Sequence, residues 1–413
     1  MSESDNLNLF DAIRPYQDHE VEAVVKRLLQ SDALIQAIIH TQFPKVSRYL
    51  EKPLAGFVRH RISRSLKGVN TVAQFQRLMG EFVSSTINKS ISEFTFGGID
   101  QLEQGKSYVF ISNHRDITLD SALLNYALVK HGLDTAEVAI GDNLLGNPLV
   151  SDLLRLNKSF VVNRSVSGIK AKFKALTELS HYIFDATQQG RSIWIAQKEG
   201  RAKDGFDITD EAIIKMLHLW PKKQGLSFQQ SMTQLNLVPV SISYEYDPCD
   251  GLKAQEMQAR ASRQYAKQEG EDVESIMRGL ALPKGRVHVQ VGQPLNVKNS
   301  GFENAATVAQ QLDQAILDNY RLFPPSLLAV EQLLQLSKVA VLSLGEESKA
   351  RFQEVSRQAR EAWDNLDPQE LAKQAAEFSA RISRYPSKIQ PYILEMYANP
   401  LLSKYKCSMD GLP

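Results

Sequence analysis

The sequence is poor in cysteine and has no excess of charge of either sign. Among its 413 residues only Cys249 and Cys407 are cysteines, too few for a disulfide framework or a cysteine-based metal site. We therefore expect a reducing compartment and no metal site. Forty-eight Lys and Arg residues against 47 Asp and Glu residues leave a net charge of +1, which predicts no nucleic-acid partner. Any anion site must come from a local cluster of cations.

Long apolar runs and nucleotide-binding signatures are missing too. No stretch approaches the ~20 apolar residues that a membrane-spanning helix needs. The first five residues are acidic and lack the basic segment and apolar core of a targeting sequence. We expect a cytoplasmic protein that is at most peripheral on the inner face of a membrane. No glycine-rich dinucleotide fingerprint or P-loop occurs, so a nucleotide-binding α/β protein ranks last among the candidate classes.

The composition and length are those of an ordinary globular protein with two or three domains, at 43% hydrophobic and 23% charged residues. Apolar residues recur at helical spacing near both ends, and Pro324 and Pro325 mark the later boundary because proline cannot continue a helix. The expected division is a helical N-terminal region over 1–88, an α/β domain over 89–325 and a helical C-terminal region over 326–413.

Short apolar or alternating runs bounded by turn residues predict strands in the central region. They lie at 93–98, 108–111, 137–142, 160–164, 192–196, 237–244 and 286–292. Segments with helical periodicity separate most of them, and 169–186 is the clearest. Strands spaced by helices predict an α/β fold with a mainly parallel sheet flanked by helices. A charged helix is expected between 251 and 268.

The stretch from 108 to 120 is the most informative. An apolar run ends in Ser-Asn-His-Arg-Asp, and helical spacing begins at Asp120. This strand–loop–helix unit places His114 at the end of a sheet, where α/β proteins build their sites. An imidazole with Asp116 and Asp120 close by suits a general base. In the alternative interpretation His114 is a surface residue and Asp120 is a helix N-cap.

Polar groups end three further predicted strands. Arg164 ends one run, Glu199-Gly200-Arg201 follows another, and Tyr244 ends a strand that contains Pro239. Glycine lets a backbone approach a ligand closely, and arginine grips a phosphate through two parallel hydrogen bonds. Taken alone, the segment around Gly200 suits a charged surface loop better than a binding site.

Together these four segments resemble the glycerophospholipid acyltransferase family, the PlsC-like enzymes that acylate glycerol 3-phosphate or lysophosphatidate. Asn113-His114 is similar to the family's histidine–aspartate block, and 160–165 resembles its second block, an apolar strand ending in arginine. Glu199-Gly200-Arg201 resembles the Glu-Gly-x-Arg block, and 238–245 resembles the Val-Pro block. The resemblance covers roughly residues 90 to 300, and four blocks in order are far more specific than one.

The chain departs from the family pattern in two places. Five residues separate His114 from Asp120 where the family usually has four, and Asp116 is only two positions away. Asp120 is favoured because it opens the helix as the family's aspartate does, and Asp116 is its rival. The block at Glu199-Gly200-Arg201 lacks its middle residue, which leaves the direction of Arg201 open.

The resemblance implies an O-acyltransferase of phospholipid biosynthesis. A fatty acyl group would move from acyl-CoA or acyl-carrier protein to a hydroxyl of glycerol 3-phosphate or lysophosphatidate, with no cofactor beyond the donor substrate. His114 would be the general base, oriented by Asp120 or Asp116. The phosphorylated glycerol acceptor would be bound by residues at the other strand ends: Arg164, Glu199, Gly200, Arg201 and Lys203. A non-catalytic lipid- or phosphate-binding protein on the same fold is the alternative.

An enzyme of this kind must reach lipid, so the resemblance also implies a membrane-surface partner. Two apolar stripes that carry cations, at 59–67 and 327–344, are the candidates for that contact. For 59–67 a solvated helix face is the favoured alternative. Packing against the α/β domain competes for both stripes, and it is favoured for the second.

Overall fold

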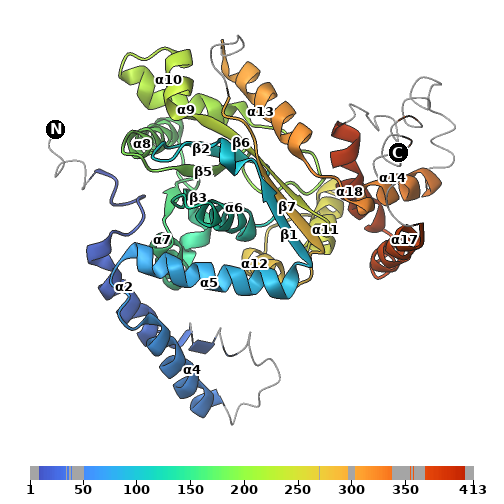
Figure 1. Ribbon diagram of the computed structural model, residues 1–413, viewed down its shortest axis with the longest axis horizontal. Coiled ribbons are helices and arrows are strands. Elements are labelled where there is room, and N and C mark those ends of the chain that lie inside the picture. The colour runs from blue at the N-terminus through green and yellow to red at the C-terminus, as the bar shows by residue number, and fades with distance from the viewer. Residues whose placement is uncertain are drawn as a thin grey trace.

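The computed structural model describes residues 9–33, 35, 36, 39, 51–268, 270–295, 303–336, 354, 357 and 368–404. Within these ranges the chain forms a seven-stranded sheet with helices on both faces (Figure 1). The strands are β1 (Glu93–Gly97), β2 (Val109–Ser112), β3 (Glu137–Gly141), β4 (Ser159–Val162), β5 (Ile193–Ala196), β6 (Leu237–Tyr244) and β7 (Arg286–Val291). The predicted α/β class is confirmed.

The strand order is β1-β7-β6-β2-β5-β3-β4, and every neighbouring pair is parallel except β6 and β7. The sheet is therefore mainly parallel, as predicted, with β1 and β7 running against the other five strands. Since β2, β3, β4, β5 and β6 share one direction, their carboxyl ends meet at one edge. We call this the carboxyl edge. Ser112, the last residue of β2, pairs there with Ala196, the last residue of β5.

Two hydrophobic cores lie on the two faces of the sheet. Successive side chains of a strand point to opposite faces, so Val109 and Ile111 join one core while Phe110 joins the other. The first core packs against α8 (Ile169–Gln188), α9 (Glu211–Lys223), α10 (Phe228–Leu235) and α13 (Ala305–Asn319). The second packs against α5 (Val72–Ser90) and α6 (Leu119–Lys130).

Further helices lie close in sequence to the strand ends. They are η2 (Ile99–Gln101), η3 (Asp142–Gly146), α7 (Pro148–Leu156), α11 (Asp250–Ala261) and α12 (Glu271–Ala281). One expectation needs correction here. The single helix predicted over 251–268 is α11, and it ends at Ala261, with α12 following as a separate helix.

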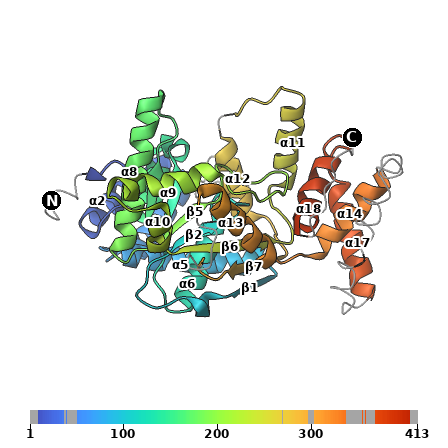
Figure 2. The same cartoon turned by 90° about the horizontal axis from the view of Figure 1, so that it is seen from above.

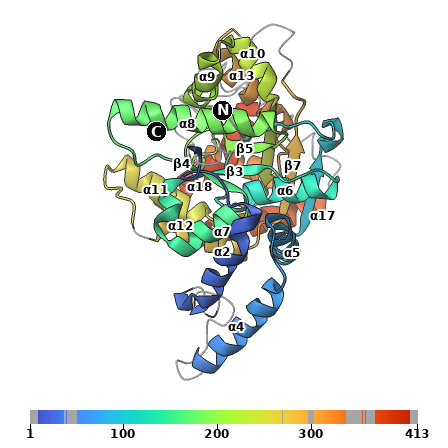
Figure 3. The same cartoon turned by 90° about the vertical axis from the view of Figure 1, so that its left-hand side faces the viewer.

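The described N-terminal residues are mainly helical, as predicted, and part of them projects from the body of the protein. Helix α2 (Asp18–Gln30) buries its apolar face against residues of α5 and α7. Helix α4 (Glu51–Leu66) projects away from the sheet (Figure 3). Its Val58 packs with Ile35 and Ile39, so part of the apolar stripe of this helix is covered. Whether the cations at 59–67 touch a membrane remains a prediction.

The C-terminal residues form a helical cluster beside α11. Helix α14 (Pro324–Leu336) begins at the predicted boundary and packs against α18 (Gln390–Lys404) and α17 (Pro368–Ile382). Leu327, Val330 and Leu333 are buried in this cluster, so the described half of the 327–344 stripe is core. Its partners are mainly other C-terminal helices rather than the sheet. Residues 337–344 lie outside the described ranges.

A buried carboxylate joins this cluster to the rest of the fold. Asp250, at the start of α11, is 1% exposed and accepts hydrogen bonds from the Arg381 guanidinium at 2.7 Å and the Tyr385 hydroxyl at 2.7 Å. The Tyr397 hydroxyl donates to it as well, at 3.0 Å. Three donors from α17, α18 and the segment between them therefore converge on α11. In the part of the chain that the structure describes, no helix is both long and apolar enough to span a bilayer.

Candidate active site

The loop after β2 is held in place by an asparagine whose side-chain amide makes the hydrogen bonds that a backbone peptide group of a strand would make. The Asn113 side chain accepts a hydrogen bond from the Ile242 backbone N–H at 2.8 Å and donates to the Ile242 carbonyl at 3.0 Å. An amide carries one donor and one acceptor in the same arrangement as a peptide group. The side chain therefore extends the pairing of β2 with β6 by one residue and fixes where the next residue, His114, begins.

His114 and Asp120 form a hydrogen-bonded pair at the carboxyl edge. The His114 Nδ1 lies 2.8 Å from the Asp120 Oδ2, and the ring meets the Trp194 ring edge-on at 5.7 Å. Because a carboxylate can only accept, Nδ1 carries the proton and Nε2 has the lone pair of a base. The His114 side chain is 14% exposed, whereas that of Asp120 is fully buried.

The Asp120 carboxylate is fixed by three more donors. Its Oδ2 accepts from the backbone N–H groups of Arg115 and Asp116 at 2.6 and 3.0 Å, and its Oδ1 accepts from the Tyr244 hydroxyl at 2.9 Å. Burial and the Asp120 charge raise the pKa of Tyr244 well above its usual value, so the phenol remains a donor. These three hydrogen bonds fix the orientation of the Asp120 carboxylate independently of the imidazole. The sequence placed Tyr244 at the end of its strand but gave no sign of this role.

Asp116 makes different hydrogen bonds from Asp120. Its Oδ1 accepts from the backbone N–H groups of Thr118 and Leu119, both at 2.9 Å, which satisfies donors at the start of α6. Burial raises the pKa of Asp116, and the nearby Asp120 charge raises it further. The geometry therefore favours Asp120 as the partner of His114 and makes Asp116 a helix cap.

Arg115, the residue after the histidine, is directed into the protein. Its guanidinium is buried and lies 2.6 Å from the Asp207 carboxylate. The buried Lys253 ammonium donates to the Arg115 carbonyl at 2.8 Å and pairs with Asp247. These contacts hold both sides of the loop backbone that carries His114. Sequence reasoning missed Asp207, Asp247 and Lys253, because nothing in their local sequence marks a partner so far along the chain.

The Glu-Gly-Arg segment lies directly against His114. The Ala202 N–H donates to the His114 carbonyl at 2.8 Å, and the Glu199 carboxylate pairs with Arg164 at 3.5 Å. Gly200 has φ = +77°, a left-handed conformation that favours glycine. Residues from the ends of β2, β4 and β5 are therefore brought together, as the strand-end pattern predicted.

Arg201 faces a groove. Its guanidinium donates to the Ser275 hydroxyl at 3.2 Å, across to α12. The groove has a volume of about 530 Å³ and runs between α11 and α12 beside Arg201. This volume falls within the range typical of small-molecule sites. Arg201 is thus placed where a small anionic molecule can reach it.

Lys203 is tied to α11. Its ammonium lies 2.5 Å from the Glu256 carboxylate, which also binds Arg260 at 2.8 Å. Burial lowers the pKa of Lys203. The predicted role of Lys203 in phosphate binding remains a prediction, because in this arrangement its charge is already paired.

The C-terminal helices hold the end of the same loop. The Asn399 side-chain amide of α18 donates to the Asp204 carbonyl at 2.6 Å. Gly205 has φ = +84°, and a Cβ at this position would lie 2.4 Å from the Met396 carbonyl. Only glycine allows α18 to approach this closely. The helical C-terminal residues therefore help to shape the candidate site. Among the described residues no cluster of His, Cys, Asp and Glu is arranged to bind a metal.

Lys284, behind Asp116, gives a prediction about stability. The side chain is fully buried and donates to the Ser90 hydroxyl at 2.9 Å and the Leu282 carbonyl at 2.8 Å. Burial lowers its pKa from 10.5 to about 8. Between these values the unfolded chain binds more protons than the native protein, so stability rises with pH. Relative to Lys284→Met, the wild type should gain about 2 kcal/mol of unfolding free energy from about pH 7.5 to about pH 9.5.

Urea denaturation of both proteins at the two pH values measures this difference. The comparison cancels the titration of tyrosines and other lysines, which both proteins share. An unfolding free-energy difference that stays constant, or that shrinks as the pH rises, would contradict the lowered pKa.

The sequence of this chain is similar to those of known acyltransferases. Residues 93–243, from β1 into β6, match a family model described as Acyltransferase. The chain is 21% identical over 340 residues to a dihydroxyacetone phosphate acyltransferase of Mus musculus, covering 81% of this chain and 48% of the relative. A Bos taurus protein of the same name is 24% identical over 206 residues, covering 49% of this chain and 28% of the relative. The chain thus spans about half or less of the length of these relatives.

A solved structure is similar as well. The 1-acyl-sn-glycerophosphate (LPA) acyltransferase PlsC from Thermotoga maritima matches 76% of this chain and 95% of its own, at 13% identity and a TM-score of 0.31. A match at that score carries no argument about this chain, so the fold assignment rests on the observed sheet.

Proposed function

We propose that the chain, whose residues 93–243 match an acyltransferase family model, is a glycerophospholipid acyltransferase that transfers a fatty acyl group from a thioester donor to a hydroxyl of a phosphorylated three-carbon acceptor. The donor is acyl-CoA or acyl-carrier protein. The observation that carries the proposal is the His114–Asp120 pair, 2.8 Å apart, at the edge of the sheet where Arg164 and Arg201 also lie. A partly exposed imidazole with a buried carboxylate behind it is suited to take a proton from a substrate.

In the proposed reaction the acceptor oxygen attacks the thioester carbonyl directly. As the new C–O bond forms, the hydroxyl proton passes to His114 Nε2, and the buried Asp120 stabilises the resulting imidazolium. The C–S bond then breaks, and the thiolate takes a proton from the imidazolium, which restores neutral His114. Cys249 is buried, and burial raises the pKa of its thiol to about 11, which disfavours it as a nucleophile.

The acceptor is proposed to be held by its phosphate. Arg201 at the groove, and Arg164, which pairs with Glu199 two residues before Arg201, offer planar guanidinium groups that can bind phosphate oxygens in pairs. Arg164 already pairs with Glu199, so a phosphate would share or replace that contact. Glycerol 3-phosphate and lysophosphatidate are the acceptors that the sequence pattern suggests, and the names of the relatives add dihydroxyacetone phosphate. Work at a membrane surface on the cytoplasmic side is part of the same proposal.

A panel of substrates tests the proposal. Purified protein is incubated with acyl-CoA or acyl-carrier protein and, in turn, with each of the three phosphorylated acceptors, and product masses are read. The expected result is one acylated, phosphate-bearing product, with the unphosphorylated glycerol analogue as the control that is not acylated. Acylation of glycerol at the same rate as of its phosphate would contradict phosphate binding.

We expect Arg201→Lys to weaken binding of the acceptor. Lysine keeps the charge but cannot offer two parallel donors to a phosphate. The KM for the phosphorylated acceptor should rise roughly tenfold or more, on the order of 1.4 kcal/mol, with the donor KM little changed. Steady-state kinetics with each substrate varied in turn measures both constants.

Arg27→Lys on α2 is the matched control, since Arg27 pairs with Asp152 outside the groove and its loss should leave both constants unchanged. A rise confined to the donor KM would mean that Arg201 contacts the acyl donor instead.

A further inference from the structure

Helix α8 exposes apolar side chains at its N-terminal end. Ile169, Phe173 and Leu176 are 88%, 51% and 40% exposed and recur at helical spacing on this end of the helix. The surrounding residues from 170 to 174 are exposed as well, whereas further along α8 one face is buried in the core, with Leu179, Tyr182 and Ile183 among its residues. We call residues 169–176 the α8 tip. A cluster of large apolar side chains in water marks a surface for interaction.

The α8 tip is also strongly basic. Lys170, Lys172 and Lys174 alternate with the apolar residues, and no acidic residue occurs from 165 to 177. The end of α9 adds Lys222 and Lys223, both exposed, and the Lys223 ammonium lies 6.0 Å from the centre of the Phe173 ring. Apolar side chains set among lysines complement an anionic lipid surface, where each cation near the surface contributes on the order of 1 kcal/mol.

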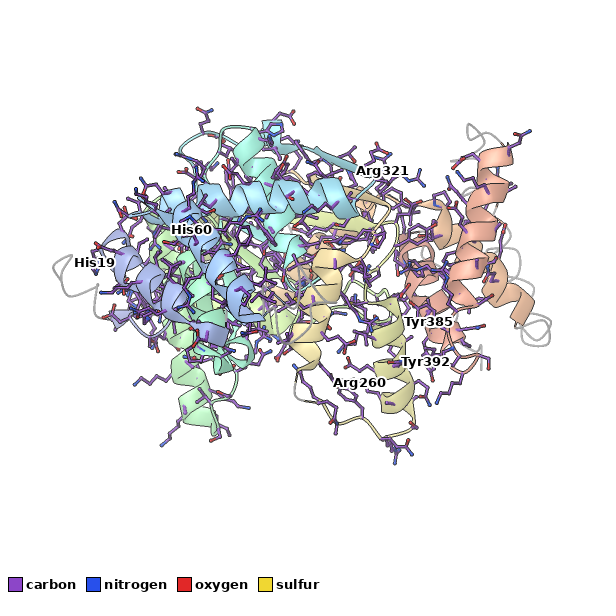
Figure 4. The ribbon with its side chains drawn as sticks, turned by 90° about the horizontal axis from the view of Figure 1, so that it is seen from below. His19, His60, Arg260, Arg321, Tyr385 and Tyr392 are labelled. Atoms are coloured by element: carbon purple, nitrogen blue, oxygen red, sulfur yellow. The ribbon has the colours of Figure 1, made fainter. Side chains whose placement is uncertain are left out.

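The tip projects on the side of the molecule that carries the candidate site. It follows β4, whose end carries Arg164, through a short loop at the carboxyl edge. Figure 2 shows α8 extending from the body on the same side as α11. In Figure 4 the same end of α8 and the side chain of Arg260 on α11 both project from that side. A surface bound by the tip would therefore face the edge at which His114 lies.

We propose that the α8 tip docks the protein on an anionic lipid bilayer, with its apolar side chains in the headgroup–acyl boundary and its lysines against lipid phosphates. The α8 tip would thus be the membrane-binding surface of the proposed lipid acyltransferase, and its purpose depends on that function. Binding itself needs no catalysis. The charge of the tip favours a bilayer over a second copy of this chain, because two identical tips would repel each other.

Flotation of the full chain with vesicles tests the proposal. One set contains equal parts of phosphatidylcholine and phosphatidylglycerol, and the other contains phosphatidylcholine alone. The wild type should bind the anionic vesicles in a salt-sensitive manner. The double variant Phe173→Ser/Lys174→Glu should lower the vesicle partition coefficient roughly tenfold or more, with an unchanged thermal midpoint because both side chains are exposed.

Two further variants serve as controls. Val129→Ser/Lys130→Glu makes the same kind of change at the end of α6, where Val129 is 55% exposed at the opposite edge of the sheet, and should not alter binding. Phe57→Ser/Arg61→Glu alters the projecting helix α4, where Phe57 is 57% exposed. Loss of binding in the α4 variant alone would overturn the assignment of docking to α8.

Retention of vesicle binding within about twofold by the α8 variant would overturn the proposal as well. So would sedimentation velocity that shows a wild-type dimer abolished by the α8 changes, since the tip would then join two copies. Because vesicles without acyl donor suffice, failure of docking leaves the proposed reaction untouched. Absence of acyl transfer in the wild type would likewise overturn the reaction and not the docking.

Discussion

Replacing His114 with alanine should lower kcat by roughly a thousandfold or more while the thermal midpoint hardly moves. The ring supplies the proposed base. The other side chain that is hydrogen-bonded to Asp120, the Tyr244 hydroxyl, is a donor and cannot replace it. Stability should survive because Asp120 keeps its bonds from the Arg115 and Asp116 N–H groups and from Tyr244. The buried carboxylate is therefore not left without donors. Initial rates at saturating substrate and a thermal melt measure the two quantities.

The control for this change is His131→Ala. His131 lies just past the end of α6, bonded to the Ala127 carbonyl at 3.2 Å and away from the carboxyl edge, so its loss should leave kcat unchanged. If His114→Ala keeps most of the wild-type rate, His114 is not the base. The fold would then more closely suit a non-catalytic lipid- or phosphate-binding protein.

The second large effect is expected from Asp120→Asn, with kcat lowered by roughly a hundredfold to ten-thousandfold. An asparagine would present an amide N–H₂ either to the imidazole or to Tyr244, and an oxygen to the other. It cannot accept from every donor that Asp120 now serves, and it cannot stabilise an imidazolium by charge. The thermal midpoint should also fall, because a buried donor is left unpaired.

Asp116→Asn is the matched control for this prediction. Asp116 needs only one carbonyl oxygen to accept from Thr118 and Leu119, and asparagine retains one. The rate should change by about threefold at most. The reverse order of effects would mean that Asp116 is the working partner of His114 and that Asp120 serves to hold the loop.

The sequence predicted the sheet and the edge of the site because both depend on local patterns. Short apolar runs marked the strands, and the change of period after residue 112 placed His114 at the end of β2. Strand direction was not visible in the same way, since the alternation of β7 is identical in either direction. The antiparallel pairing of β7 with β6 therefore emerged only from the structure.

The contacts that hold the site in place could not be predicted from the sequence. Asp207 meets Arg115 from 92 positions away, and Lys253 reaches the Arg115 carbonyl from 138 positions away. Such pairs depend on how loops from different strands fold over the edge. The choice between Asp116 and Asp120 was open for the same reason, because both follow His114 closely and only their hydrogen bonds separate them.

The central claim is that this site transfers an acyl group to a phosphorylated acceptor without an acyl-enzyme. Release of free thiol from acyl-CoA, followed in the presence and absence of the acceptor, tests it most directly. Direct attack predicts thiol release only when the acceptor is present, in equal amount to the acylated product, and its loss in His114→Ala. Thiol release that proceeds equally without any acceptor, or none with any acceptor of the panel, would contradict it.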